Sequence, residues 1–131
     1  MFVDEDSKDL QIKLIDFGFA EKFDRKKGMK LILGSPLYMA PELVTKDIYN
    51  ECIDVWALGI ITYLLLCGIT PFQATTIQQI HENVLNNEVF FDNRNWTGVS
   101  DEAKHFIMTC LNKDHKTRKS INWLLINDRW L

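Results

Sequence analysis

The sequence has 131 residues, of which 47% are hydrophobic and 25% are charged, a composition typical of one folded globular unit rather than a disordered chain. The formal net charge of -3 gives no overall positive field, which argues against wholesale binding to nucleic acid or to an anionic membrane surface. The longest apolar run, residues 55–67, is shorter than the ~20 residues that a membrane-spanning helix needs, so no membrane span is expected.

The first expected elements are a short hairpin and a loop. Residues 10–15 alternate apolar with polar side chains, which predicts a half-buried strand, and a shorter strand around Phe2 and Val3 would pair with it through the acidic turn 4–9. Residues 19–33 follow no period. Their basic cluster, residues 25–27 before Gly28, indicates an exposed loop.

Everything after Pro41 is helical in pattern. Residues 54–67 are apolar nearly all round, which predicts a helix at the centre of a helical domain, ended by Gly68 and Pro71. Three later helices are expected to begin after the hydroxyl residues Thr76, Ser100 and Ser120, with Gln79 completing a capping box. Their expected apolar faces are, in order, Ile77, Ile80, Val84 and Leu85; then Ala103, Phe106, Ile107, Cys110 and Leu111; then Leu124 and Leu125.

The three cysteines, Cys52, Cys67 and Cys110, lie far apart in apolar surroundings and lack the close spacing of metal ligands. Buried free thiols are therefore predicted, as is usual in a reducing compartment. The N-terminal residues also lack the basic and apolar regions of a signal peptide. These observations predict an intracellular, cytoplasmic location.

Three motifs carry the chemistry. Asp16-Phe17-Gly18 follows the predicted strand, where a carboxylate can project into a cleft and glycine allows a sharp turn. Alone, this tripeptide is also compatible with a plain turn. However, Gly-Ser-Pro-Leu-Tyr-Met-Ala-Pro-Glu at residues 34–42 and Asp-Val-Trp-Ala-Leu-Gly at residues 54–59 follow it in order and at matching distances.

With these motifs the sequence resembles the eukaryotic protein kinase family, in which Asp-Phe-Gly opens the activation segment and Ala-Pro-Glu closes it. The resemblance covers residues 1–131 and implies a mainly α fold: the C-terminal lobe of a kinase, with a short N-terminal β-hairpin, as an incomplete domain. It implies ATP and Mg²⁺ as cofactors, with Asp16 as a metal ligand and Phe17 and Gly18 at the cofactor site. Phe17 would pack beneath the cleft.

The resemblance also assigns supporting and substrate-binding residues. Glu42 is expected to form a buried ion pair with Arg118, and Asp54 to accept hydrogen bonds from the backbone of a catalytic loop. Ser35 stands where serine/threonine kinases carry threonine, which places the chain in that class. Gly34 and Ser35 belong to the activation segment, and Ile32, Pro36 and Met39 match the pocket for the residue after the phosphoacceptor.

Within the family the sequence is most similar to the calcium/calmodulin-dependent and calcium-dependent group. This similarity rests on residues 65–72, 96–104 and 127–131, with departures at His115 and at Asp128-Arg129. It implies a protein substrate, and control by calmodulin or by a fused calcium-binding domain outside this chain. Residues 19–33 contain no Ser, Thr or Tyr, so ordering of this loop without phosphorylation is predicted, although its lysines could merely solvate it.

Several kinase motifs do not occur in these residues: a Gly-rich loop, the phosphate-binding lysine and its glutamate, and a His-Arg-Asp loop. The catalytic aspartate is expected upstream of Met1, which is interpreted as an internal methionine, and the isolated chain is predicted to be inactive and marginally stable. A fragment of an active kinase is the favoured hypothesis. The alternatives are a non-catalytic, kinase-derived protein-binding module using the groove near the helix after Thr76 and, more remotely, an unrelated helical interaction domain.

Overall fold

The computed structural model describes residues 12–24, 27–92 and 94–131, so most of the expected N-terminal hairpin lies outside the described residues. In these ranges the chain forms a 3-10 helix and five α-helices: η1 (Pro36–Tyr38), α1 (Pro41–Val44), α2 (Cys52–Cys67), α3 (Ile77–Asn86), α4 (Asp101–Cys110) and α5 (Ile121–Asn127). An isolated antiparallel bridge joins Met29 to Tyr49. The fold is mainly helical, as the sequence predicted.

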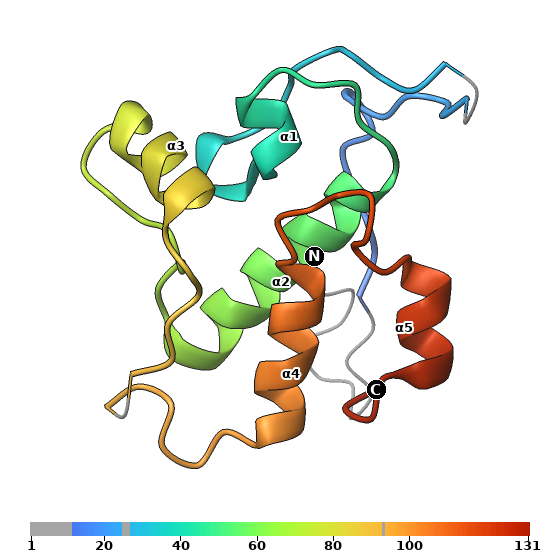
Figure 1. Ribbon diagram of the computed structural model, residues 1–131. Coiled ribbons are helices and arrows are strands. Elements are labelled where there is room, and N and C mark those ends of the chain that lie inside the picture. Colours follow the sequence, from blue (N-terminus) through green and yellow to red (C-terminus); the bar gives the residue numbers. More distant parts are fainter. Residues whose placement is uncertain (1–11, 25–26, 93) are drawn as a thin grey trace.

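Helix α2 lies at the centre of the fold and packs against α4, whereas α1 packs against α3 at the other side (Figure 1). It begins at Cys52, two residues before the expected start, where the side chain of Asn50 accepts a hydrogen bond from the Cys52 N–H at 2.9 Å. It ends at Gly68, which has a φ of 82° and donates its N–H to the Leu64 carbonyl at 2.8 Å. Glycine suits this left-handed position because it has no Cβ.

The three predicted caps are confirmed. The side-chain oxygens of Thr76, Ser100 and Ser120 accept hydrogen bonds from the backbone N–H groups of Gln79, Ala103 and Trp123 at 3.2, 3.2 and 3.3 Å. The capping box is only half formed, since the side chain of Gln79 instead accepts a hydrogen bond from the Thr75 hydroxyl at 2.9 Å. Local hydrogen bonding therefore fixes where these helices begin.

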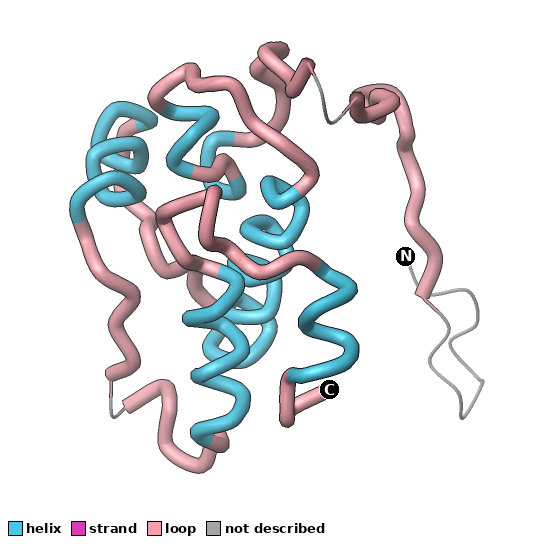
Figure 2. The backbone as a smooth tube through the Cα atoms, turned by 45° about the vertical axis from the view of Figure 1, so that its right-hand side comes forward, coloured by secondary structure: helices cyan, strands magenta, loops and turns pink. Residues whose placement is uncertain are grey.

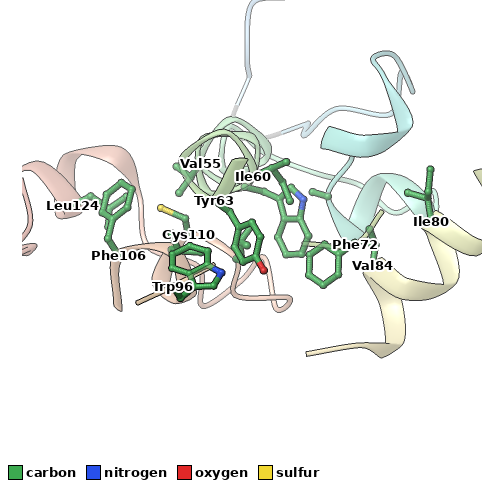
Figure 3. Close-up of a cluster of buried hydrophobic side chains, with 14 residues drawn as sticks. Val55, Ile60, Tyr63, Phe72, Ile80, Val84, Trp96, Phe106, Cys110 and Leu124 are labelled. Atoms are coloured by element: carbon green, nitrogen blue, oxygen red, sulfur yellow. The ribbon is translucent and has the colours of Figure 1, made fainter. Parts of the chain in front are cut away.

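The core lies between α2, α3, α4 and α5 (Figure 3). The expected apolar face of α4 is confirmed, since all five of its predicted residues are buried. The expected faces of α3 and α5 were too wide. Ile80, Val84 and Leu124 are buried, but Ile77, Leu85 and Leu125 are 58%, 38% and 65% exposed, because no described element packs on that side of either helix.

The cysteines are free, as predicted, and Cys52 and Cys110 are buried whereas Cys67 is half-buried. Burial raises the pKa of the Cys110 thiol to about 12, so it stays protonated at neutral pH. No helix in the described ranges is long and apolar enough to span a membrane.

The chain from residue 12 to residue 18 runs apart from the helical body (Figure 2), and it returns to that body at Phe19 and Glu21, which line a pocket with residues of α1 and α2. Ile12, Leu14 and Ile15 are 72%, 84% and 63% exposed, so the part of the expected strand that the structure describes is not half-buried. The structure also assigns no strand to residues 13–15, so the expected strand is not confirmed in the described part of this segment. Its burial requires a packing surface that the described residues do not supply.

The crossing of α2 and α4 depends on Gly59. A Cβ at this position would lie 2.7 Å from Cys110 Cβ and 2.8 Å from a Leu111 side-chain carbon. We expect Gly59→Ala to lower the free energy of unfolding by about 2 kcal/mol, because an overpacking cost of about 3 kcal/mol exceeds the ~1 kcal/mol that alanine gains in a helix. Urea unfolding of the full-length protein measures this change.

Gly98→Ala is the control for that substitution. Gly98 has a φ of 83°, and a Cβ there would meet nothing within 4 Å, so its cost reflects backbone strain without a clash. An unchanged stability of Gly59→Ala would show that the two helices do not approach as closely as described here.

Candidate functional site

Asp16 has an unusual backbone conformation. Its φ is 60°, in the left-handed region that non-glycine residues rarely occupy at a cost of roughly 1–2 kcal/mol. Its Oδ1 accepts a hydrogen bond from the Gly18 N–H at 3.2 Å, and the Ala20 N–H donates to the Phe17 carbonyl at 3.0 Å. These bonds form a compact turn that leaves the Asp16 carboxylate exposed.

The Phe17 ring is 68% exposed, so the expected packing beneath a cleft is not seen among the described residues. Asp16 is suited to Mg²⁺ as a single ligand, because Mg²⁺ prefers oxygen and commonly uses one or two carboxylates with phosphate oxygens and waters. No group of three or more metal-ligating side chains lies together in the described ranges. A metal held by these residues alone is therefore not suggested.

Residues 34–39 form a tight turn leading into α1. Gly34 has a φ of 113°, and Ser35 precedes η1 without its side chain making a capping hydrogen bond. The Tyr38 N–H donates to the Ser35 carbonyl at 3.0 Å, and the Met39 N–H donates to the Pro36 carbonyl at 3.3 Å. Ser35 is exposed and Pro36 and Met39 are half-buried, which leaves this turn accessible to a partner molecule.

Gly34 and Asp54 line one pocket of about 190 Å³ between the loop and the start of α2. Its lining residues are Phe19, Glu21, Met29, Leu31, Leu33, Gly34, Leu43, Tyr49, Ile53 and Asp54. The pKa of Asp54 is raised above its ordinary value because its surroundings partly exclude water. No hydrogen bond to this carboxylate comes from the described residues, so it is available to donors from elsewhere.

Glu42 and Arg118 form a buried, bidentate ion pair. Arg118 donates to the two carboxylate oxygens of Glu42 at 2.7 and 3.0 Å, and both residues are at most 4% exposed. Arg118 also donates to the carbonyls of Asn112 and Cys52 at 2.7 and 3.0 Å, and its guanidinium lies 5.1 Å from the centroid of the Trp56 ring. This arrangement ties the end of residues 34–42 to α2 and to the loop before α5.

The structure therefore brings some of the expected site residues together and leaves others apart. Glu42 pairs with Arg118, and Gly34 lies in the same pocket as Asp54, whereas Asp16 belongs to the segment that runs apart from the helical body. Tyr49 was missed from sequence. It is buried, pairs with Met29, and donates its hydroxyl to the Leu31 carbonyl, and no sequence signal marks a side chain that bonds to a distant backbone group.

Comparison with known proteins agrees with the motifs. Residues 1–131 match the protein kinase domain family. The chain is 38% identical over 130 residues to calcium-dependent protein kinase 5 of Plasmodium falciparum, covering 99% of this chain and 22% of that protein. It is 36% identical over 126 residues to a probable myosin light chain kinase of Dictyostelium discoideum, covering 96% of this chain and 36% of that protein.

A third relative is myosin light chain kinase 2 of skeletal and cardiac muscle from Mus musculus, 38% identical over 120 residues, covering 92% of this chain and 19% of that protein. The chain thus spans well under half the length of these relatives. Nearly all of its own residues are nevertheless matched.

Proposed function

This chain belongs to the protein kinase family, and we propose that it is the C-terminal part of a serine/threonine kinase domain that transfers the γ-phosphate of ATP to protein serine or threonine. Its group is that of the calcium-dependent and myosin light chain kinases. Serine/threonine specificity is supported by Ser35-Pro36, in which Ser35 is exposed and Pro36 begins η1.

The observation that carries an enzymatic role is the conformation of Asp16. A φ of 60° is uncommon outside glycine, and at Asp16 it accompanies the hydrogen bond from the Gly18 N–H, so a local turn leaves the carboxylate exposed and supporting no packing among the described residues. A protein-binding module would gain nothing from such a carboxylate, whereas a Mg²⁺ ligand must project from the backbone. A carboxylate that a local turn holds outward therefore favours catalysis over scaffolding.

The proposed roles follow from position. Asp16 would bind Mg²⁺, with Phe17 and Gly18 beside it, and bound Mg²⁺ would neutralise charge on the ATP phosphates. The turn Gly34–Met39, with Ile32, would contact the protein substrate. Glu42, Asp54 and Arg118 would act as supports, since Glu42 and Arg118 anchor that turn and the Asp54 carboxylate can accept hydrogen bonds from a catalytic loop.

Transfer also needs groups that these residues do not include, above all a catalytic aspartate, so we propose that the isolated chain is inactive. The full-length gene product should transfer phosphate from ATP to serine- or threonine-containing peptides when Mg²⁺ is present and stop when it is chelated. Transfer to tyrosine peptides alone would contradict the serine/threonine assignment. The absence of any transfer would favour the non-catalytic binding module.

The evidence for the alternative function, a non-catalytic binding module, comes from α3. Ile77 and Leu85 on this helix are 58% and 38% exposed and offer an apolar contact to a partner protein. Calcium control through calmodulin or a fused calcium-binding domain would have to lie outside these residues, and it is suggested by the sequence resemblance and by the names of the relatives. An intracellular, cytoplasmic location likewise stays a prediction.

An uncovered face of α2 supports the view that further kinase residues complete this fold. Ile61 and Leu65 lie one turn apart on the mostly apolar helix α2, and they are 42% and 79% exposed. We expect Ile61→Glu/Leu65→Glu to raise the monomeric fraction of the isolated chain and to lower the melting temperature of the full-length gene product, where this face would be covered. Size-exclusion chromatography and thermal unfolding measure the two effects.

Gln73→Glu, at an exposed residue outside α2, adds charge without touching that face and should change neither measurement. If the double variant has the same effect on the isolated chain and on the full-length gene product, the face is not covered by the rest of the kinase domain.

A further inference from the structure

Tyr49 links residues 29–33 to the start of α2. Its N–H donates to the Met29 carbonyl at 3.1 Å, and its carbonyl accepts a hydrogen bond from the Met29 N–H at 3.0 Å. Its hydroxyl donates to the Leu31 carbonyl. The residue is 4% exposed, so three hydrogen bonds to the backbone of one loop are made from a buried position.

The α2 side of this link is firmly held. Asn50, the next residue, accepts a hydrogen bond from the N–H of Cys52, and the Cys52 carbonyl in turn accepts one from the buried guanidinium of Arg118 at 3.0 Å. Tyr49 therefore has a fixed location relative to the core. The loop residues that Tyr49 binds, Met29 and Leu31, are therefore held at a fixed position relative to the core.

The loop side has little else to hold it. Leu31 and Leu33 are 57% and 38% exposed, so their packing against the helical body is only partial. Residues 19–33 contain no Ser, Thr or Tyr that could be phosphorylated to order the loop. At Gly28 the loop backbone passes close to Ile48, the residue before Tyr49. Gly28 has a φ of 63°, and a Cβ added there would lie 2.3 Å from Ile48 Cγ2, so only glycine fits at this position.

The local electrostatics keep the hydroxyl as a donor. Burial, and then the nearby charge of Glu21, raise the pKa of Tyr49 above its ordinary value. The phenol thus stays protonated and can donate to Leu31. Tyr49 and Glu21 line the same pocket, so the tyrosine also lies close to the residues that follow the Asp16 turn.

We propose that Tyr49 is a positioning residue for the substrate-binding turn Gly34–Met39, a role that rests on the kinase function proposed above. By holding Met29 and the Leu31 carbonyl, it fixes the chain three residues before Gly34 and replaces the ordering that a phosphate would supply. Its effect should appear in the binding of the protein substrate and not in the binding of ATP.

The test is Tyr49→Phe in the full-length gene product, which keeps the ring and both backbone bonds and removes the hydroxyl bond. Losing one buried hydrogen bond corresponds to about a fivefold change, so the KM for a serine peptide should rise about fivefold while the KM for ATP and the kcat stay within about twofold. Hydrogen exchange at residues 29–33 should accelerate by a similar factor.

Tyr63→Phe is the matched control. Tyr63 is also 4% exposed, and its hydroxyl donates to a backbone carbonyl, that of Phe90, at 2.7 Å, far from the loop. It should lose comparable stability without changing the peptide KM or exchange at residues 29–33. Equal changes in both variants, or none in Tyr49→Phe, would overturn the proposal.

The kinetic test and the exchange test also separate the two proposals. If the unmodified gene product transfers no phosphate to any peptide, the kinase function fails, and hydrogen exchange alone then decides whether Tyr49 orders the loop. If transfer is present and exchange at residues 29–33 is unaffected by Tyr49→Phe, the positioning role fails and the kinase function stands.

Discussion

Arg118→Met should lower the free energy of unfolding of the full-length gene product by about 3–5 kcal/mol, because it leaves the carboxylate of Glu42 buried without a counter-charge. The carbonyls of Asn112 and Cys52 lose their donor in the same change. Methionine preserves much of the volume over the Trp56 ring, so the loss would reflect charge and hydrogen bonding rather than a cavity. Urea unfolding measures this effect.

Three further variants sharpen this experiment. Lys119→Met removes a neighbouring, exposed cation that lies 5.0 Å from the centroid of the Trp123 ring, and it should cost less than about 1 kcal/mol. The double variant Glu42→Gln/Arg118→Met removes both charges and should recover part of the loss. The cycle is completed by the single variant Glu42→Gln. A loss in the double variant equal to the sum of the losses in Glu42→Gln and Arg118→Met would show that the two residues do not act as a pair.

The pairing of Glu42 with Arg118 could be anticipated from family resemblance, but the rest of Arg118's environment could not. Two of its acceptors are backbone carbonyls, which every residue carries, so no side-chain pattern points to Asn112 or Cys52. For the same reason the role of Tyr49 could not be predicted from the sequence, because its partners are backbone groups of Met29 and Leu31.

The helix positions could be predicted from the sequence because the signals that start and end a helix are local. A hydroxyl at Thr76, Ser100 or Ser120 bonds to an N–H three residues later, and Gly68 ends α2 through its own backbone freedom. Which face is buried depends on neighbours instead. Ile80 and Val84 on α3 are buried, but Ile77 is exposed, and the helix's own periodicity does not distinguish them.

The Asp-Phe-Gly turn shows the same limit at the candidate site. Its residue types predicted a turn with a projecting carboxylate, and Asp16 forms one with the Gly18 N–H. The predicted burial of Phe17 and of residues 12–15 depends on surfaces contributed by other parts of a domain, and the described residues do not supply them. A local motif thus predicts local backbone geometry, whereas the burial of its side chains depends on which other parts of the domain pack against them.

Asp16→Asn is expected to lower the kcat of the full-length gene product by at least about 100-fold, since one metal ligand contributes several kcal/mol of charge stabilisation to phosphate transfer. Asparagine can still accept a hydrogen bond from the Gly18 N–H and tolerates a positive φ, so the turn should persist. Because the side chain is exposed, the melting temperature should change little. Peptide phosphorylation at increasing Mg²⁺ concentrations provides the measurement.

Asp101→Asn, which alters an exposed carboxylate at the start of α4, should retain normal activity and serves as the control. If Asp16→Asn lowers activity and melting temperature together, the carboxylate supports the fold rather than the metal. If it leaves both unchanged, Asp16 does not bind Mg²⁺, and a non-catalytic binding module is favoured over an enzyme. A loss of activity that excess Mg²⁺ partly restores would connect the Asp16 carboxylate directly to metal binding.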